Sequence, residues 1–281
     1  MSGAIQNIII NGQPVCRLSQ IAFVTLLLVL PFQAVTAQGP GPGSHWLHGA
    51  IVRGDTSSAE LALVFTGDEY ADGGMHIANV LANRRIKASF FLTGKFYRNP
   101  EFKALIEELV KGGHYMGAHS DQHLLYCSWE KRDSLLVTEK QFRKDLQENY
   151  SVMYEFGISQ KDAPFFLPPY EWCNDSVASW TRNMALQLIN HTHGTLSHAD
   201  YTVPGTPIYR SSEEIYQSIL DYESASPRGL NGFILLVHIG TASERTDKFY
   251  LHLDELISEL KTRGYKFKRI DGLLKGKEDE S

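Results

Sequence analysis

The sequence lacks a large excess of charge of one sign, an internal repeat and a long membrane-spanning apolar run. Its formal net charge is −5, and both signs are spread along its 281 residues. It therefore has no basic stripe of the kind that binds nucleic acid, and no acidic tail. With 43% hydrophobic and 21% charged residues, it has the composition of an ordinary globular chain with one sizeable core. We expect no nucleic acid partner.

The N-terminus carries an apolar run at residues 21–30, which follows Arg17 and precedes small residues that end at Ala37. Charged, apolar and small residues in this order are typical of a secretory signal peptide. A membrane anchor is the alternative, but an apolar run of about ten residues is short for a span of about 20. We therefore expect residues 1–37 to be a signal peptide. The mature protein would be exported, periplasmic or secreted, with no stable membrane span.

Cysteine is scarce, because removal of the signal peptide would leave only Cys127 and Cys173. An exported protein matures where a disulfide can form. A bridge requires a distance that the sequence does not give, so a disulfide and two free buried thiols both remain open.

Short apolar, β-branched or aromatic runs alternate with amphipathic segments after a Gly-Pro-rich linker at residues 38–44. The folded part is expected to begin near Ala59, with residues 38–58 as linker and lead-in. The seven predicted strands are residues 61–65, 88–92, 115–118, 165–167, 186–190, 233–237 and 266–270. The predicted helices are residues 75–85, 101–111, 139–154, 211–222 and 248–263. This alternation predicts an α/β fold, a (β/α) barrel with about seven parallel strands.

Two histidines four residues apart, His119 and His123, follow the third predicted strand. Imidazoles at this spacing can share one face of a helical turn. Asp68, just after the first strand, would complete a three-ligand metal site with room for water. The alternatives are two solvated imidazoles in a surface turn and a turn or cap role for Asp68. His238 ends the sixth strand, and such strand ends are where active-site residues of parallel α/β folds gather. A core histidine is the alternative there.

These motifs resemble those of the polysaccharide deacetylase family, metal-dependent enzymes on a deformed (β/α) barrel that remove acetyl groups from carbohydrates. The resemblance spans roughly residues 60–272. The segment 119–123 fits the family's His-Ser/Thr-x-x-His metal motif, and residues 236–238 fit its Leu-x-His motif, whose histidine is the general acid. Residues 167–170 resemble its Arg-x-Pro-Tyr/Gly motif in the prolines and the tyrosine, and residues 88–94 resemble its second strand.

The chain departs from the family at two places. Where the family usually has Thr-Phe-Asp-Asp, with the first Asp as base and the second as metal ligand, Thr66 and Gly67 overlay on the two aspartates. Asp68 would reach the metal if the chain bulges at Gly67, because glycine allows unusual backbone angles. Leu167 stands in place of the family's tuning arginine.

The resemblance implies an exported, metal-dependent hydrolase that removes N- or O-linked acetyl groups from a polysaccharide, with residues 59–275 as its catalytic domain. One divalent ion, Zn²⁺ as first choice, would be held by Asp68, His119 and His123, although this ligand set also suits iron, cobalt, nickel or manganese. His238 would protonate the leaving group. Since Thr66 cannot act as the base, Glu69 and Glu171 are the candidates, and Glu69 is preferred because it follows the proposed ligand.

Other side chains near these motifs are candidates for substrate binding or support. Pro169 and Tyr170 belong to the segment 167–170 that resembles the Arg-x-Pro-Tyr/Gly motif, and Asp200 is the candidate for orienting His238. An aromatic group of Tyr126, Tyr170 and Trp172 either stacks on a sugar ring or packs in the core.

Two other functions remain open. A non-catalytic carbohydrate-binding relative of the same fold would account for the missing aspartates and arginine, whereas retention of His238 speaks against it, because binding alone needs no general acid. A hydrolase of the same fold acting on a non-carbohydrate amide is opposed only by the expected export.

Overall fold

The computed structural model describes residues 43–274, so the expected signal peptide and most of the expected linker lie outside the described residues. The described residues all belong to one compact unit. Among residues 43–274, no helix combines the length and the apolar character that crossing a membrane requires.

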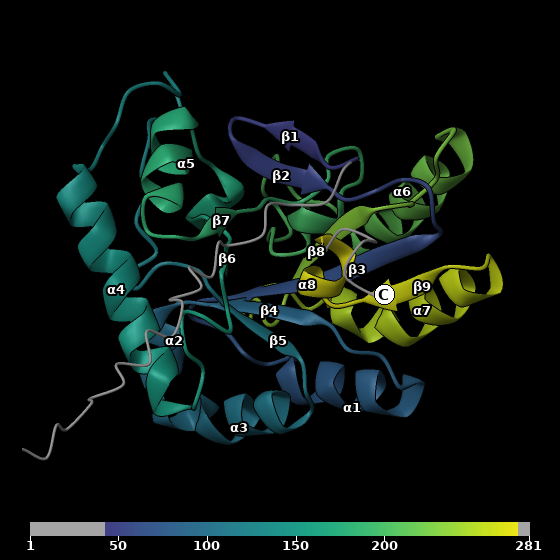
Figure 1. Ribbon diagram of the computed structural model, residues 1–281. Helices are drawn as coiled ribbons and strands as arrows, with labels where there is room; N and C mark the ends of the chain where they lie inside the picture. The colour runs from purple at the N-terminus through teal and green to yellow at the C-terminus, as the bar shows by residue number, and fades with distance from the viewer. Residues whose placement is uncertain (1–42, 275–281) are drawn as a thin grey trace, which may run out of the picture. The chain divides into compact units, whose positions relative to one another are not determined.

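A nine-stranded sheet forms the centre of this unit (Figure 1). Its order is β1-β2-β8-β3-β4-β5-β6-β7, and β9 pairs with β3. All pairings are parallel except β1 with β2 and β2 with β8. The strands are β1 (His45–Leu47), β2 (Ala50–Arg53), β3 (Glu60–Gly67), β4 (Ser89–Leu92), β5 (Tyr115–Ala118), β6 (Phe165–Phe166), β7 (Gln187–Leu188), β8 (Phe233–His238) and β9 (Lys266–Lys268).

The sheet curls so that residues after β7 meet its other side. Ile189 bridges to Ile51 of β2, and the Thr192 N–H donates to the Ile234 carbonyl of β8 at 3.0 Å. The predicted α/β fold is confirmed as a curled half-barrel of mostly parallel strands, and each of the seven predicted strands is present.

The folded part begins earlier than Ala59, because β1 and β2 precede that residue and β2 pairs with β8. His48 and Gly49 between them have φ values of 49° and 73°. Two successive positive φ angles match the twist of a tight hairpin, and they connect these two short strands. The segment expected to be a lead-in is therefore part of the sheet.

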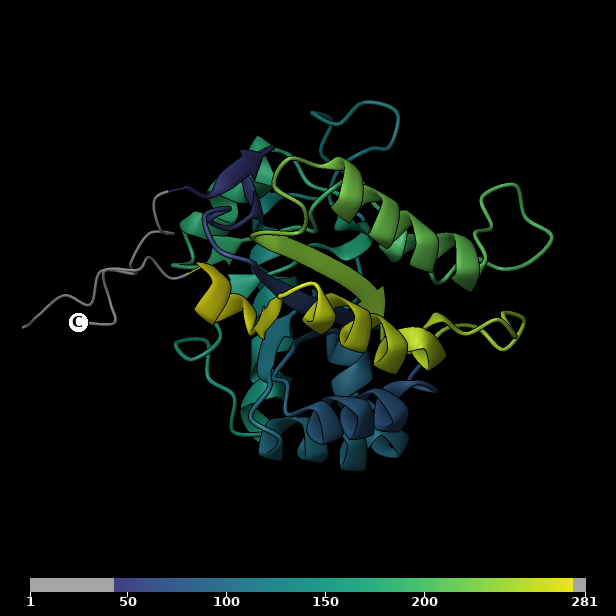
Figure 2. The ribbon, with the colours of Figure 1, turned by 90° about the vertical axis from the view of Figure 1, so that its right-hand side faces the viewer.

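Helices lie outside the sheet, and in Figure 2 β8 runs between α6 and α7. The five predicted helices correspond to α1 (Gly74–Arg84), α3 (Lys103–Lys111), α4 (Glu139–Glu155), α6 (Ser212–Ala225) and α7 (Leu253–Thr262). Three shorter helices were not predicted: α2 (Gly94–Arg98), α5 (Asp175–Arg182) and α8 (Ile270–Leu274). Short 3-10 helices are η1 (Pro100–Phe102), η2 (Pro169–Glu171), η3 (Ser197–Ala199) and η4 (Phe249–His252).

Helices α4 and α6 each begin with a capping box, at Thr138 and at Ser211. Each side chain accepts the N–H of the third helical residue, which satisfies a backbone donor that has no partner within the helix.

The parallel register places Thr66 of β3 beside His238 of β8. The carboxyl ends of β3, β5 and β8 therefore present their polar residues at the same edge of the sheet.

Candidate active site

A cavity of about 440 Å³ opens at this edge of the sheet. It collects side chains from the segments that follow β3, β5, β6 and β8 and from the segment after η3. The lining residues are Thr66, Gly67, Asp68, Glu69, Tyr70, His119, His123, Trp129, Tyr170, Glu171, Tyr201, Val203, His238, Gly240, Thr241 and Ala242. Of the predicted site residues, Pro169 and Asp200 are not in this set, which is drawn from the described part of the chain.

His119 and His123 come together on a loop rather than on a helical turn. Their ring centroids are 5.2 Å apart. Ser120 and His123 have φ values of 73° and 55°, which an α-helix does not allow. The expectation that helical spacing brings the two rings together is therefore wrong, and the loop needs another support.

Asp145 on α4 supplies that support from a buried position. Its carboxylate accepts the Ser120 hydroxyl at 2.7 Å, the Gln122 N–H at 3.0 Å and the Tyr126 hydroxyl at 2.7 Å. One turn further along α4, the Asn149 side chain accepts the His119 N–H at 2.9 Å. Sequence reasoning missed both residues. Their position on the apolar face of a predicted helix could have revealed them, because a buried polar side chain there requires partners.

We expect Asp145→Ala to lower the free energy of unfolding by about 3 kcal/mol or more, because it leaves several buried donors without an acceptor. Urea denaturation measures this change. Glu148→Ala on the same helix is the matched control, since Glu148 is half exposed and its ion pair is with the exposed Lys144 at 3.6 Å. It should change stability by less than about 0.5 kcal/mol. Equal losses in the two variants would contradict a special role for Asp145.

His119 is oriented as a metal-binding histidine usually is. Its Nδ1 lies 2.8 Å from the Leu167 carbonyl oxygen, which makes Nδ1 the donor and leaves the Nε2 lone pair free. Burial lowers the pKa of His119 well below its ordinary value, so the ring is neutral at pH 7. A neutral imidazole is the form that binds metal ions.

Asp68 lies beside His123, with Oδ2 at 3.8 Å from Nδ1. The Thr93 hydroxyl donates to its other oxygen at 2.8 Å and holds the carboxylate in place. A carboxylate and two imidazoles suit a divalent ion by their chemistry. The side chains of residues 43–274 nevertheless form no group of three or more His, Cys, Asp or Glu that is close enough to hold one.

The bulge at Gly67 that would bring Asp68 to the metal is absent. The register of β3 on β4 continues without a shift through the pair Gly67 and Leu92. A Cβ at Gly67 would lie 2.7 Å from Ile239, 2.9 Å from Leu92 and 3.0 Å from Phe96, so an aspartate cannot replace it without repacking. Glycine is needed here for space. Thr66 is buried, lines the cavity, and its hydroxyl has no hydrogen-bond partner among the described residues.

His238 and Asp200 form a close pair at the end of β8. The Asp200 carboxylate lies 2.6 Å from Nδ1 of His238 and also accepts the His238 backbone N–H at 2.9 Å. Burial opposes the charged imidazole, but Asp200 and Glu171 outweigh it and raise the pKa of His238. The pairing leaves Nε2 as the nitrogen that can hand a proton to a bound molecule.

The two candidate bases lie in different environments. Glu69 is exposed at the cavity rim, whereas Glu171 is half-buried. Burial raises the pKa of Glu171 to about 7, although His238 counteracts part of the rise. Tyr170 and Glu171 have φ values of 59° and 52°, so this turn holds two consecutive side chains in the left-handed region at the cavity wall. Pro169 is buried at the start of the same turn.

The aromatic group differs from the predicted one. Tyr126 is fully buried and donates to Asp145, so it packs in the core. Trp129, which was not predicted, is 54% exposed and lines the cavity. Its ring centroid lies 5.7 Å from that of Tyr170 and 5.0 Å from that of Trp172. Neighbouring Cys127 and Cys173 are both buried and free, without a disulfide.

A family model described as polysaccharide deacetylase matches residues 53–189. An uncharacterized 30.6 kDa protein of Geobacillus stearothermophilus is 26% identical over 250 residues, which cover 87% of this chain and 83% of that protein. A peptidoglycan-N-acetylmuramic acid deacetylase of Bacillus subtilis is 24% identical over 229 residues, with 82% and 76% covered.

Solved structures share the fold at low sequence identity. A family 4 carbohydrate esterase from Bacillus subtilis aligns with a TM-score of 0.62 at 22% identity, covering 80% of this chain and 85% of that one. A pseudoenzyme of the same esterase family from Bacillus anthracis has a TM-score of 0.63 at 20% identity, with 82% and 70% covered. An acetyl xylan esterase from Clostridium thermocellum in complex with cobalt has a TM-score of 0.57 at 23% identity, with 76% and 89% covered.

Proposed function

Because residues 53–189 belong to the polysaccharide deacetylase family, we propose that this chain is an exported, metal-dependent hydrolase that removes acetyl groups from a polysaccharide. The observation that carries the proposal is that one cavity is lined by Glu171, whose pKa is raised, and by His238, which pairs with Asp200. The same cavity is lined by His119, His123 and Asp68. The relative that deacetylates peptidoglycan supports an N-acetylated glycan as substrate. The apolar run at residues 21–30 supports export.

In the proposed reaction, Glu171 is the base that takes a proton from the attacking water. Its pKa of about 7 lets the carboxylate form near neutral pH while remaining basic enough to accept that proton. Glu69 is the weaker candidate, because its exposed position gives it no comparable environment. This choice differs from the one favoured by sequence order.

His238 is the proposed general acid. Asp200 holds Nδ1, so the opposite ring nitrogen is the one available to protonate the departing amine or alkoxide. The raised pKa of His238 keeps the ring protonated to higher pH than a free histidine. Tyr170 and Trp129 form the exposed aromatic wall against which a sugar ring would stack.

Asp68, His119 and His123 are the proposed ligands of the metal ion, with Zn²⁺ as the first choice. The donor types and the Nδ1 hydrogen bond of His119 fit this role, although the three side chains do not converge as a group that could hold an ion. When bound, a divalent ion would polarise the acetyl carbonyl and lower the pKa of a water. The cobalt complex of a protein with the same fold supports metal dependence.

We expect the mature protein to bind one Zn²⁺ per chain in a calorimetric titration, and His119→Ala to weaken this binding at least about tenfold, because it removes one ligand. His114→Ala is the control, since His114 is a partly buried histidine whose Nδ1 accepts the Ala88 N–H at 3.1 Å. Unchanged affinity in His119→Ala would contradict the proposed ligand set.

A non-catalytic carbohydrate-binding protein is the second candidate. Thr66 and Gly67 take the places of the family's two aspartates, and one protein with the same fold is a pseudoenzyme. Acetate release from a panel of N- and O-acetylated glycans, measured with metal-loaded mature protein, separates the two functions. Release supports the hydrolase. Binding of a glycan without any release would move the assignment to the binding protein.

A further inference from the structure

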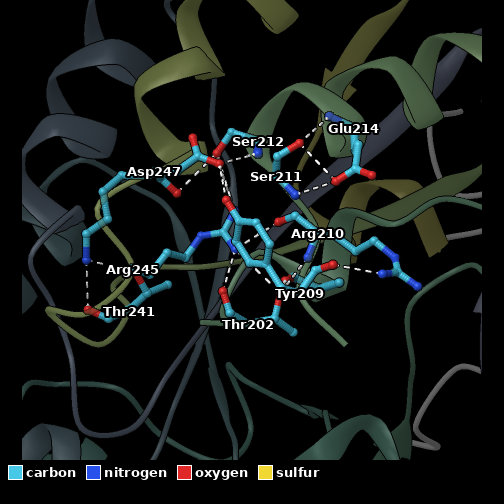
Figure 3. A network of polar contacts seen from close by, with 11 residues as sticks. Thr202, Tyr209, Arg210, Ser211, Ser212, Glu214, Thr241, Arg245 and Asp247 are labelled. Carbon is cyan, nitrogen blue, oxygen red and sulfur yellow. Dashed lines mark hydrogen bonds and ion pairs between the residues drawn. The ribbon is translucent and has the colours of Figure 1, made fainter. Parts of the chain in front are cut away.

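Arg245 is a fully buried arginine in the loop after β8, and the reaction proposed above leaves it without a role. Its guanidinium donates to the carbonyl oxygens of Thr202 at 2.6 Å and Arg210 at 3.0 Å, and reaches the Ser212 hydroxyl at 3.4 Å (Figure 3). All three acceptors lie on the segment between η3 and the first residue of α6. Arg245 therefore joins two chain segments that are far apart in the sequence.

Asp247 links the same two segments as a hydrogen-bond acceptor, whereas Arg245 is a donor. Its carboxylate accepts the Ser212 N–H at 2.6 Å and the Tyr209 hydroxyl at 3.0 Å (Figure 3). It lies 3.8 Å from the Arg245 guanidinium and so balances part of the buried charge. Donor and acceptor side chains from one loop thus hold the other loop at several points.

The fastened segment carries Asp200, the partner of His238. Thr202 follows Asp200 by two residues, and its hydroxyl donates to the Ala199 carbonyl at 2.7 Å. The bond from Arg245 to Thr202 therefore restrains the backbone next to Asp200. Tyr201 on the same segment packs on the His238 ring, with centroids 5.1 Å apart, and lines the cavity.

Stability alone gives a poor reason for this arginine. Burying a guanidinium is costly, and apolar side chains of similar size often replace buried ion pairs without loss of stability. The Arg245 Nε–H also has no hydrogen-bond partner within residues 43–274. We propose that Arg245 is a positioning residue, which fastens the segment between η3 and α6 and so keeps Asp200 against His238. The catalytic part of this inference rests on the function proposed above.

Arg245 could affect the pKa of His238 through its charge or through the placement of Asp200, and these two effects predict pKa changes of opposite sign when Arg245 is replaced. Burial lowers the pKa of His238, whereas the charges of Asp200 and Glu171 raise it. The charge of Arg245 also lowers this pKa, and its effect is the smallest of these. His119, His123, His191 and His198 also lie within electrostatic reach of His238. Losing only the charge of Arg245 would raise the titration midpoint of His238. Losing the placement of Asp200 would lower it.

The experiment is an NMR titration of the His238 ring in the wild type, Arg245→Met, Asp200→Asn and a control, Arg53→Met. Arg53 also ties backbone carbonyls, those of Asn231 and Gly229, each at 2.8 Å, but beside the opposite end of β8. We expect Arg245→Met to lower the midpoint by about one pH unit, toward that of Asp200→Asn, and Arg53→Met to leave it unchanged. A raised or unchanged midpoint in Arg245→Met would overturn the inference.

Arg245→Lys covers the case in which Arg245→Met does not fold. Lysine keeps the charge, but its single ammonium cannot replace both Nη1, which holds the Thr202 and Arg210 carbonyls, and Nη2, which faces Ser212 and Asp247. The midpoint should therefore again fall. An unchanged midpoint in this variant would then count against the inference. Acetate release measured beside the titration should show kcat reduced about tenfold in Arg245→Met, with kcat of Arg53→Met near the wild-type value. Because the titration needs no turnover, it remains decisive if the proposed activity fails.

Discussion

His238→Ala should reduce acetate release about 10²- to 10⁴-fold while the protein stays folded and still binds its glycan, because the change removes only the proposed proton donor. The pair with Asp200 at 2.6 Å gives this histidine its orientation, and its raised pKa keeps the ring protonated to higher pH than a free histidine. The measurement is kcat on the glycan that the wild type deacetylates best, with folding followed by thermal melting.

The matched control is His45→Ala, since His45 lies exposed on β1. It should leave kcat at the wild-type value. If His238→Ala released acetate as fast as the wild type, another group would have to protonate the leaving group. A wild-type protein that binds glycan and releases no acetate, with unchanged affinity in His238→Ala, would favour the binding protein.

The arrangement of the barrel could be predicted because each strand is a short apolar run followed by an amphipathic segment. Residues 61–65 and 233–237 show this clearly, and in the structure they are the centres of the paired strands β3 and β8. The hairpin of β1 and β2 escaped prediction because both strands are very short and follow a Gly-Pro-rich stretch. Its register depends on the His48-Gly49 turn and on pairing with β8, which is distant in the sequence.

The meeting of the site residues in one cavity followed from the rule that strand ends gather at one edge of a parallel sheet. Asp68, His119, Glu171 and His238 do line one cavity. What sequence could not supply was the support around them. Asp145 reaches the loop after β5 from a helix about two dozen residues later, and its role depends on tertiary packing rather than on local spacing.

The environment of each carboxylate was equally hidden from sequence reasoning. Proximity along the chain favoured Glu69, which is exposed, whereas the turn after β6 places Glu171 where burial raises its pKa. The role of Gly67 was also hidden from sequence reasoning. Its role is to leave space for Ile239, Leu92 and Phe96, and none of these three contacts can be inferred from its neighbours in the sequence.

Glu171→Gln should lower kcat about 10²- to 10⁴-fold, because glutamine keeps the size of the side chain and cannot accept the proton. The wild-type pH profile of kcat should rise through about pH 7 as Glu171 ionises, since its pKa is raised to about 7. The profile should fall as His238 loses its proton, at a higher pH than a free histidine would, because its pKa is raised. The rising limb should disappear in Glu171→Gln. The falling limb should move to lower pH, because Glu171 helps to keep His238 protonated.

Glu69→Gln is the discriminating control, since Glu69 lies at the rim of the same cavity and has the same side chain. If Glu171 is the base, Glu69→Gln keeps both limbs of the profile and most of kcat. The opposite pattern, with the rising limb lost only in Glu69→Gln, would return the role to the residue beside Asp68. Equal losses in both variants would indicate that the negative charge at the cavity matters more than either proton acceptor, because the two carboxylates share only their charge and their opening onto the cavity.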